Sequence, residues 1–174
     1  QALIHTSRAN GYNAKILEEV EQANFEQKRV IPKKIVKRFG ENLEGKRFAV
    51  WGLAFKPDTD DMRQAASITI INELTSKGAV ICAYDPKAET EAKEFYLKGN
   101  SKVEYVDSKY TALIAADALV LVTEWKEFKV PDFEEIKKRL KAPVIFDGRN
   151  QYDSRKMKEM GFEYYQIGAG GSSV

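Results

Sequence analysis

The sequence has few cysteines, few histidines and no long apolar run, and each shortage excludes a class of protein. One cysteine cannot form a disulfide within the chain, so nothing points to an oxidising compartment and we expect a cytoplasmic protein. A single histidine with no Cys/His cluster leaves a metal site without support. The longest apolar stretch, 112–122, contains Asp117 and is shorter than the ~18 residues of a membrane span, so no membrane contact is expected.

The sequence also lacks an excess of one charge sign. It contains 28 Lys and Arg residues against 26 Asp and Glu residues, which leaves a formal net charge of +2. A nucleic-acid-binding domain needs a marked excess of Lys and Arg on one face, so we expect no nucleic acid as a partner. The 174 residues, 43% of them hydrophobic, suffice for one globular domain with a core and an additional segment.

Residues 1–40 contain no strand-like run, and their apolar side chains recur at helical spacing. The pattern predicts a short helix over 2–9 and a long amphipathic helix over 13–39. Pro32 lies inside the long helix and removes one backbone hydrogen bond, so we expect a kink near 27–30 or a split into two helices. A continuous helix would be about 40 Å long, more than this domain needs, so part of it should pack on something outside the domain.

From Lys46 onward, short apolar and β-branched runs alternate with polar stretches of helical character, which is typical of βαβ units. The continuous apolar run 118–122 indicates a strand buried on both faces, as in a parallel sheet between two layers of helices. We therefore predict an α/β fold: a doubly wound, mainly parallel, Rossmann-like sheet of about six strands, preceded by the long N-terminal helix. The expected strands are 47–51, 80–84, 103–106, 118–123, 144–147 and 162–167.

Helices are expected between these strands. Ser67 is expected to cap one of them, Asp132 a second, and Asp153 or Ser154 a third. The C-terminal residues are rich in Gly and Ser, which is typical of a flexible tail. The expected organisation is therefore central helices over 1–40, an α/β domain over 41–168 and a tail over 169–174.

Three cations follow strands of the predicted sheet. Lys56 and Arg63 belong to the loop after the first strand, and Arg149 follows the fifth. In such a sheet, ligands bind beyond the carboxyl ends of the strands, and Arg and Lys suit phosphate groups. The first loop keeps only Gly52 of the G-x-G-x-x-G pattern that holds a dinucleotide, so we expect a phosphorylated ligand other than NAD at this loop.

The same residues also have structural interpretations. Lys56 fits a solvated loop lysine, and Arg149 fits a surface arginine after a turn. Arg63 could simply pair with Asp60 or Asp61. Their shared location at one sheet edge favours the ligand-binding interpretation.

Other polar and aromatic residues are expected to have structural roles. Asp85 is better explained as a strand-ending turn than as a ribose-binding acid. Cys82 lies mid-strand and fits a buried inert thiol, and His5 has no acid and nucleophile nearby. Trp125 and the pair 164–165 are expected to be packing residues.

Four motifs occur in order along the chain: Gly52-Leu-Ala-Phe-Lys-Pro-Asp-Thr-Asp-Asp-Met-Arg63, Tyr84-Asp85-Pro86, Thr123-Glu124-Trp125 and Phe146-Asp147-Gly148-Arg149-Asn150. With these motifs the chain resembles the UDP-glucose 6-dehydrogenase family over nearly its whole length. The resemblance is to the central helix and the C-terminal, UDP-binding domain of such enzymes. In the family, the NAD-binding domain and the nucleophilic cysteine precede the stretch that matches Gln1, so this chain, which lacks an initiating methionine, is expected to be a fragment that is inactive alone.

The resemblance implies an enzyme that oxidises UDP-glucose to UDP-glucuronate in two hydride transfers to NAD. Phe55, Lys56 and Arg149 match substrate-binding positions, and Arg63 matches an arginine that reaches the NAD pyrophosphate; no catalytic residue is expected in this chain. The long helix matches a segment that joins the UDP-binding and NAD-binding domains and forms a homodimer. Two alternatives stay open: a sister dehydrogenase for a UDP-N-acetylhexosamine or GDP-mannose, and a non-catalytic nucleotide-sugar-binding module.

Overall fold

The computed structural model describes residues 2–169, and it confirms the α/β fold with a six-stranded sheet. The predicted strands all occur, and β3, β4 and β6 are shorter than predicted by one or two residues. Residues 170–174, which make up most of the predicted tail, lie outside the described residues. The strands are β1 (Arg47–Trp51), β2 (Val80–Tyr84), β3 (Val103–Tyr105), β4 (Ala118–Leu121), β5 (Val144–Asp147) and β6 (Glu163–Gln166).

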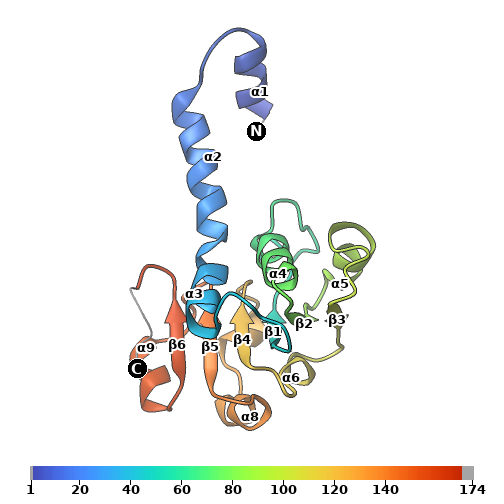
Figure 1. The fold of residues 1–174 in the computed structure, drawn as a ribbon, viewed down its shortest axis with the longest axis vertical. Helices are drawn as coiled ribbons and strands as arrows, with labels where there is room; N and C mark the ends of the chain where they lie inside the picture. The colour runs from blue at the N-terminus through green and yellow to red at the C-terminus, as the bar shows by residue number, and fades with distance from the viewer. Residues whose placement is uncertain (1, 170–174) are drawn as a thin grey trace.

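The sheet is parallel throughout, in the order β3-β2-β1-β4-β5-β6. All carboxyl ends therefore lie along one edge, which is the upper edge of the sheet in Figure 1. The chain builds outward from β1 to β3 and then crosses back to place β4 on the other side of β1. Such a reversal leaves a crevice between the loops that follow β1 and β4, where ligands of doubly wound sheets bind.

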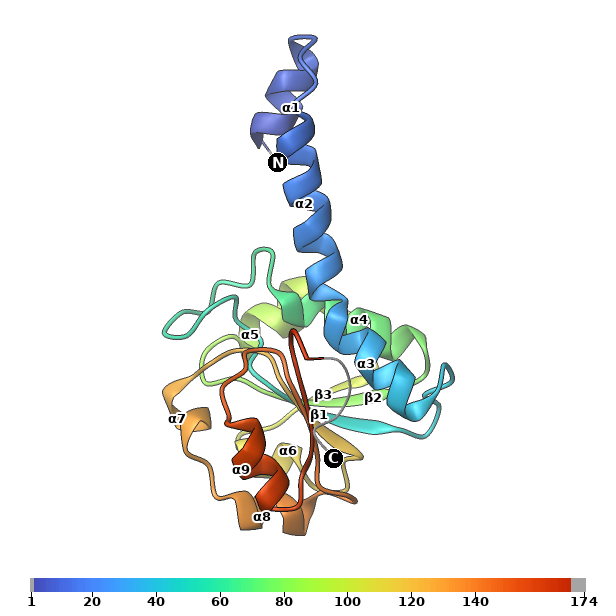
Figure 2. The ribbon, with the colours of Figure 1, turned by 90° about the vertical axis from the view of Figure 1, so that its left-hand side faces the viewer.

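Helices cover both faces of the sheet. Figure 2 shows α3 (Val30–Phe39) and α4 (Ala66–Ser76) on one side and α6 (Lys109–Ala112), α8 (Phe133–Arg139) and α9 (Ser154–Glu159) on the other. The remaining helical segments are α1 (Ala2–Ala9), α2 (Lys15–Lys28), α5 (Glu89–Glu91), the π-helical turn η1 (Ala92–Tyr96) and α7 (Lys126–Lys129). No helix within residues 2–169 has the length and apolar character needed to cross a membrane.

Two of the predicted helix caps are confirmed and one is wrong. The side chains of Asp132 and Asp153 accept backbone N–H bonds in the first turns of α8 and α9. Ser67 does not cap α4, which begins one residue earlier, after Ala65. Its hydroxyl is buried and donates to the carbonyl oxygen of Leu53 at 2.5 Å. The serine therefore holds the loop after β1 against α4.

The long N-terminal helix is divided, as the position of Pro32 predicted. Arg29, at φ −92° and ψ −4°, separates α2 from α3. Pro32 thereby falls in the first turn of α3, where its missing N–H would have had no partner within the helix. α3 buries Ile31 and Ile35, whereas α2 buries none of its residues and projects beyond the sheet (Figures 1 and 2).

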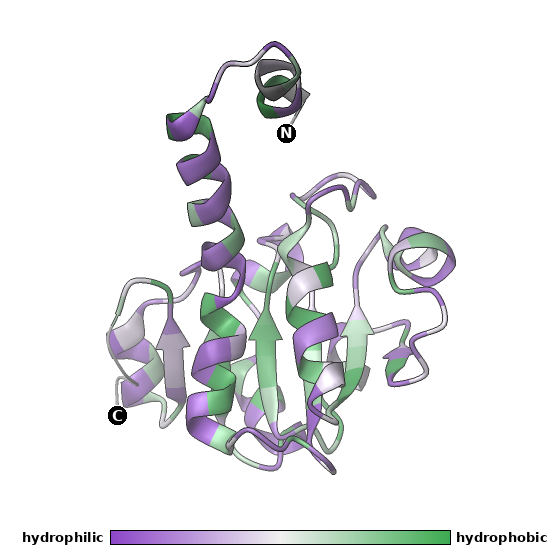
Figure 3. Ribbon diagram, turned by 45° about the horizontal axis from the view of Figure 1, so that its top comes forward, coloured by the Kyte–Doolittle hydropathy of each residue, from purple (hydrophilic) through white to green (hydrophobic). Residues whose placement is uncertain are grey.

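The core lies between the sheet and its two helical layers. Figure 3 shows hydrophobic strands in the middle of the molecule and a mostly hydrophilic α2. Phe48 packs edge to face on Phe39 of α3, with ring centroids 5.4 Å apart. On the other face, the fully buried Trp51 stacks on Phe128 at 5.1 Å and donates its indole N–H to the Lys109 carbonyl oxygen at 2.8 Å. The boundary between the helices and the α/β domain near residue 40 stays a prediction.

Candidate functional site

Asp85, which follows β2, fixes the loop after β1. Its Oδ2 accepts the N–H groups of Leu53 at 2.6 Å and Ala54 at 3.1 Å, and the indole N–H of Trp125 at 3.1 Å. Its Oδ1 accepts two N–H groups of its own turn at 2.9 and 2.8 Å. An ionised carboxylate has about four lone-pair sites, so these five donors leave none for a ribose hydroxyl. The turn interpretation of Asp85 is confirmed.

The loops after β1 and β4 meet at Gly52 and Thr123. The Thr123 hydroxyl donates to the carbonyl oxygen of Ala54 at 2.6 Å. Gly52 has φ +94°, and a Cβ there would lie 2.5 Å from the Thr123 Cβ and 2.6 Å from its backbone nitrogen. The crevice between β1 and β4 is therefore closed at its base, and a ligand has room only above these loops.

Replacing Gly52 with alanine is expected to lower the free energy of unfolding by about 2 kcal/mol more than replacing Gly40. The two glycines have φ of +94° and +93°, but nothing lies within 4 Å of a Cβ at Gly40. The pair of variants therefore separates the clash with Thr123 from the cost of the backbone conformation. Urea unfolding of both variants measures the difference, and equal losses would contradict the close approach of the two loops.

The turn after β5 is built around Asp147, which is fully buried. Its Oδ1 accepts the N–H of Arg149 at 2.8 Å, and its Oδ2 accepts the Tyr164 hydroxyl at 2.7 Å. Asn150 has φ +51°, a left-handed conformation that Asn tolerates. Its amide donates to the carbonyl oxygen of Ile167 at 3.0 Å and accepts the N–H of the same residue at 2.8 Å. These contacts fix the backbone on both sides of Arg149.

The side chain of Arg149 pairs with Glu124, which follows β4. Nη2 of Arg149 donates to Oε1 at 2.7 Å, and Nε contacts Oε2. Burial raises the pKa of Glu124, but the Arg149 hydrogen bond and nearby positive charges outweigh burial and place the pKa below its ordinary value. Glu124 is therefore ionised at neutral pH, and Arg149 is a cation held in one place rather than a free surface arginine.

The two cations of the first loop have different surroundings. The guanidinium of Arg63 forms a bidentate ion pair with Asp61, with Nε 3.0 Å from Oδ1 and Nη2 2.7 Å from Oδ2. This is the pairing that the structural interpretation of Arg63 predicted, although the guanidinium is still 81% exposed. Lys56 is exposed, and among residues 2–169 it makes no hydrogen bond or ion pair. Both side chains are accessible to a ligand.

Arg63→Ala is expected to raise the pKa of Asp61 from about 2 toward the ordinary value of about 3.9. The hydrogen bond from the Arg63 side chain is the largest cause of the lowered pKa, and alanine removes it. NMR titration of the Asp61 carboxyl carbon between pH 1.5 and 6 measures the shift. Asp153 is the control, because its pKa is lowered mainly by the backbone N–H of Lys156 and should not move. An unchanged Asp61 pKa would mean that the ion pair does not form in solution.

A cleft of about 1430 Å³ lies between the α1–α2 hairpin and the carboxyl edge of the sheet. Phe55 and Arg149 both line it, so the structure brings these two predicted site residues together. Lys56 and Arg63 are not among its lining residues. The other lining residues from the sheet domain include Gln64, Ala66, Ile70, Val122, Gly148 and Ile167.

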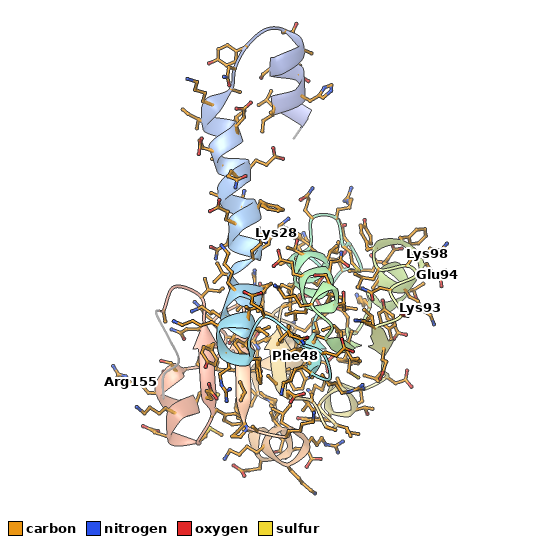
Figure 4. All side chains as sticks on the ribbon, in the orientation of Figure 1. Lys28, Phe48, Lys93, Glu94, Lys98 and Arg155 are labelled. Atoms are coloured by element: carbon orange, nitrogen blue, oxygen red, sulfur yellow. The ribbon has the colours of Figure 1, made fainter. Side chains whose placement is uncertain are left out.

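The end of α2 also belongs to this cleft. The Lys28 ammonium donates to the Gln64 side-chain oxygen at 3.1 Å, and Arg29 pairs with Glu73 of α4. Figure 4 labels Lys28 where α2 approaches α4. Neither Lys28 nor Gln64 could be predicted from the sequence, because helical periodicity does not say which loop a side chain on the helix reaches.

None of the remaining candidates lines the cleft. Cys82 is buried in β2, and burial raises the pKa of its thiol, as expected for a packing residue rather than a nucleophile. Trp125 and Tyr164 are buried, as predicted. His5 is exposed on α1. The described part of the chain holds no group of three or more His, Cys, Asp or Glu side chains able to bind a metal ion.

Comparison with known families supports the resemblance. Residues 49–154 match the model of the UDP-glucose/GDP-mannose dehydrogenase family, UDP binding domain. This segment contains the loops after β1, β2, β4 and β5. It therefore covers Phe55, Lys56, Arg63 and Arg149 together with their partners Asp61 and Glu124.

Individual relatives cover almost all of the chain. The UDP-glucose 6-dehydrogenase of Pseudomonas aeruginosa is 40% identical over 170 residues, 97% of this chain but 38% of the relative. A solved UDP-glucose dehydrogenase from Pyrobaculum islandicum is 26% identical, with a TM-score of 0.76, over 94% of this chain and 34% of that one. An NDP-N-acetyl-D-galactosaminuronic acid dehydrogenase from Methanosarcina mazei is 28% identical, with a TM-score of 0.68, over 85% of this chain and 30% of that one. The chain thus spans less than two fifths of the length of each of these three relatives.

Proposed function

Because the chain belongs to the UDP-glucose/GDP-mannose dehydrogenase family, we propose that it is the C-terminal, UDP-binding part of an NAD-dependent UDP-glucose 6-dehydrogenase. The match of residues 49–154 to the UDP-binding domain carries this proposal. The intact enzyme would oxidise UDP-glucose to UDP-glucuronate in two hydride transfers. The catalytic nucleophile and the NAD-binding domain would come from elsewhere in the protein.

In this proposal the diphosphate lies above the loops that follow β1 and β5. Arg149 donates to phosphate oxygens, for which a guanidinium fork is well suited. Lys56 adds a mobile positive charge, and Phe55, 57% exposed, contacts the substrate. Holding the nucleotide half of the substrate would place its sugar for reaction in the neighbouring domain.

NAD is not expected to bind here in the way that a dinucleotide-binding domain holds it, because the loop after β1 keeps only Gly52 of the G-x-G-x-x-G pattern. Asp85 has no lone pair left for a ribose, and Gly52 and Thr123 close the crevice at its base. NAD would accept the hydride when bound to the NAD-binding domain. In this chain, the exposed guanidinium of Arg63 is the group that suits the pyrophosphate of NAD. Arg63 is therefore proposed to reach the cofactor from across the gap between the two domains.

A titration of this chain with nucleotides tests the proposal. Calorimetry should detect UDP and UDP-glucose binding, and both should bind more tightly than GDP and GDP-mannose. A preparation that binds UDP should form no NADH with UDP-glucose and NAD, because the nucleophile is not expected in this chain. Absence of UDP binding, or a preference for GDP-mannose, would overturn the proposal.

A sister dehydrogenase for a UDP-N-acetylhexosamine is the second candidate, and the similarity to the Methanosarcina mazei enzyme favours it. Both candidates share UDP, so binding of UDP itself does not separate them. Competition between UDP-glucose and UDP-N-acetylmannosamine for binding to this chain separates the two candidates. NADH formation by the chain alone would count against both, and a non-catalytic module predicts no activity even in the full-length protein.

We further propose that α2 pairs with a second copy of the chain in a homodimer. Ile16 and Val20, four residues apart on one face of α2, are 80% and 53% exposed. Changing both to glutamate is expected to weaken the dimer at least tenfold, because two buried apolar side chains would become charges. Analytical ultracentrifugation measures the change. Lys15→Glu, which alters charge on α2 without removing apolar surface, is the control, and a dimer unaffected by the double substitution would exclude this interface.

A further inference from the structure

Arg149 and Glu124 follow the neighbouring strands β5 and β4, and their side chains form a side-on ion pair. The pair uses the Nε and Nη2 side of the guanidinium. A guanidinium has five N–H bonds, so three remain outside this pair. Among residues 2–169, these three have no acceptor. The free N–H groups belong to a residue that lines the cleft.

The backbone of Arg149 is already fixed, which leaves only its side chain to be ordered. Asp147 accepts its N–H, and Asn150 ties the following residue to Ile167. An arginine side chain has several rotatable bonds, and immobilising such a side chain on binding lowers the affinity for the ligand. A partner that orients the guanidinium before the ligand arrives removes that loss of affinity.

Glu124 is placed to be this partner. It directly follows Thr123, whose hydroxyl is bonded to the loop after β1, so its own backbone is anchored. Its side chain is 33% exposed and that of Arg149 is 44% exposed, so the pair sits at the rim of the cleft rather than in the core. The lowered pKa of Glu124 keeps the carboxylate charged, as a lasting pair requires.

We propose that Glu124 is a positioning residue of the UDP site: it orients Arg149 so that the remaining N–H groups point at the diphosphate, and it makes no contact with the ligand itself. This inference rests on the proposed function, because it needs a diphosphate at Arg149. It also implies that the negative charge of Glu124 is tolerated beside an anionic ligand only because Arg149 neutralises it.

A double-mutant cycle measured by UDP calorimetry tests the proposal. Glu124→Ala is expected to weaken UDP binding roughly threefold to tenfold, the range that corresponds to ordering one long side chain. In an Arg149→Ala background, the same change is expected not to weaken binding further, because no guanidinium remains to be oriented. Glu124→Gln keeps one acceptor oxygen, so its UDP affinity should lie between those of Glu124→Ala and the unchanged chain. This variant replaces Glu124→Ala in the test if the alanine variant does not fold.

The control is Glu134→Gln, which removes a carboxylate from the exposed surface of α8 and should leave UDP affinity unchanged. Unchanged or tighter UDP binding by Glu124→Ala would overturn the proposal. Equal weakening in both backgrounds would also overturn it, because Glu124 would then contact the ligand directly. Failure of the unsubstituted chain to bind UDP would instead overturn the proposed function, so the two failures are distinguishable.

Discussion

Asp85→Ala is expected to lower the free energy of unfolding by about 3 to 5 kcal/mol. Asp85 is 5% exposed, and its carboxylate accepts five hydrogen bonds from the loops that follow β1, β2 and β4. Alanine leaves three buried backbone N–H groups and the buried Trp125 indole N–H without their acceptor, while the fourth backbone N–H, that of the exposed Lys87, can bind water. The free energy of unfolding in urea, with the slope of the transition as a check on two-state behaviour, measures the loss.

Asp132→Ala is the matched control for this prediction. It deletes the same side-chain atoms, but the Asp132 carboxylate accepts one hydrogen bond, from the N–H of Glu135 at 3.0 Å, as the cap of α8. Loss of one such cap costs about 1 kcal/mol. Equal losses for the two variants would mean that the loop after β1 finds other acceptors and does not depend on Asp85.

The Asp85 variant also has a consequence for the site. The Leu53 and Ala54 N–H groups that Asp85 binds immediately precede Phe55 and Lys56. Any variant that stays folded should therefore bind UDP more weakly, because the loop that carries two proposed substrate-binding residues has lost its anchor.

The strands could be predicted from the sequence because buried strands have apolar local sequences. The run Ala118–Leu121 is buried at every position, and a strand buried on both faces is apolar throughout. Three short helices, α5, α6 and α7, were not predicted, since they span only three or four residues and show no helical period. The helix cap predicted for Ser67 is wrong for a related reason. A serine near the start of a helix fits a cap, but the carbonyl oxygen that its hydroxyl binds belongs to Leu53, 14 residues away.

The site could be predicted in part. Arg149 was identified because it follows a strand, and in a parallel sheet every strand end belongs to one edge. Its partner Glu124 lies 25 residues away, and the pairing depends on the adjacency of β4 and β5. Lys28 was missed because the direction in which α2 leaves the sheet depends on contacts such as that between Arg29 and Glu73.

Arg149→Ala is expected to weaken UDP binding by about 10 to 100 fold. Hydrogen bonds to charged groups contribute about 1.5 to 3 kcal/mol each, and the fork offers such bonds to the diphosphate. The substitution also leaves the Glu124 carboxylate without its partner at the rim of the cleft, where it would repel the ligand. Calorimetry of UDP binding measures the effect, and Lys56→Ala, which removes a charge without a fixed geometry, should have a smaller one.

Two further arginine variants decide whether the fork or merely the charge matters. Arg149→Lys keeps the charge but not the planar fork, so most of the affinity should still be lost. Arg155→Ala removes the same charge from the exposed surface of α9, labelled in Figure 4, and should leave UDP affinity unchanged. If Arg155→Ala weakened binding as much as Arg149→Ala, the net charge of the domain would govern affinity. If Arg149→Ala and Lys56→Ala both bound UDP normally, the diphosphate would not lie at this edge of the sheet.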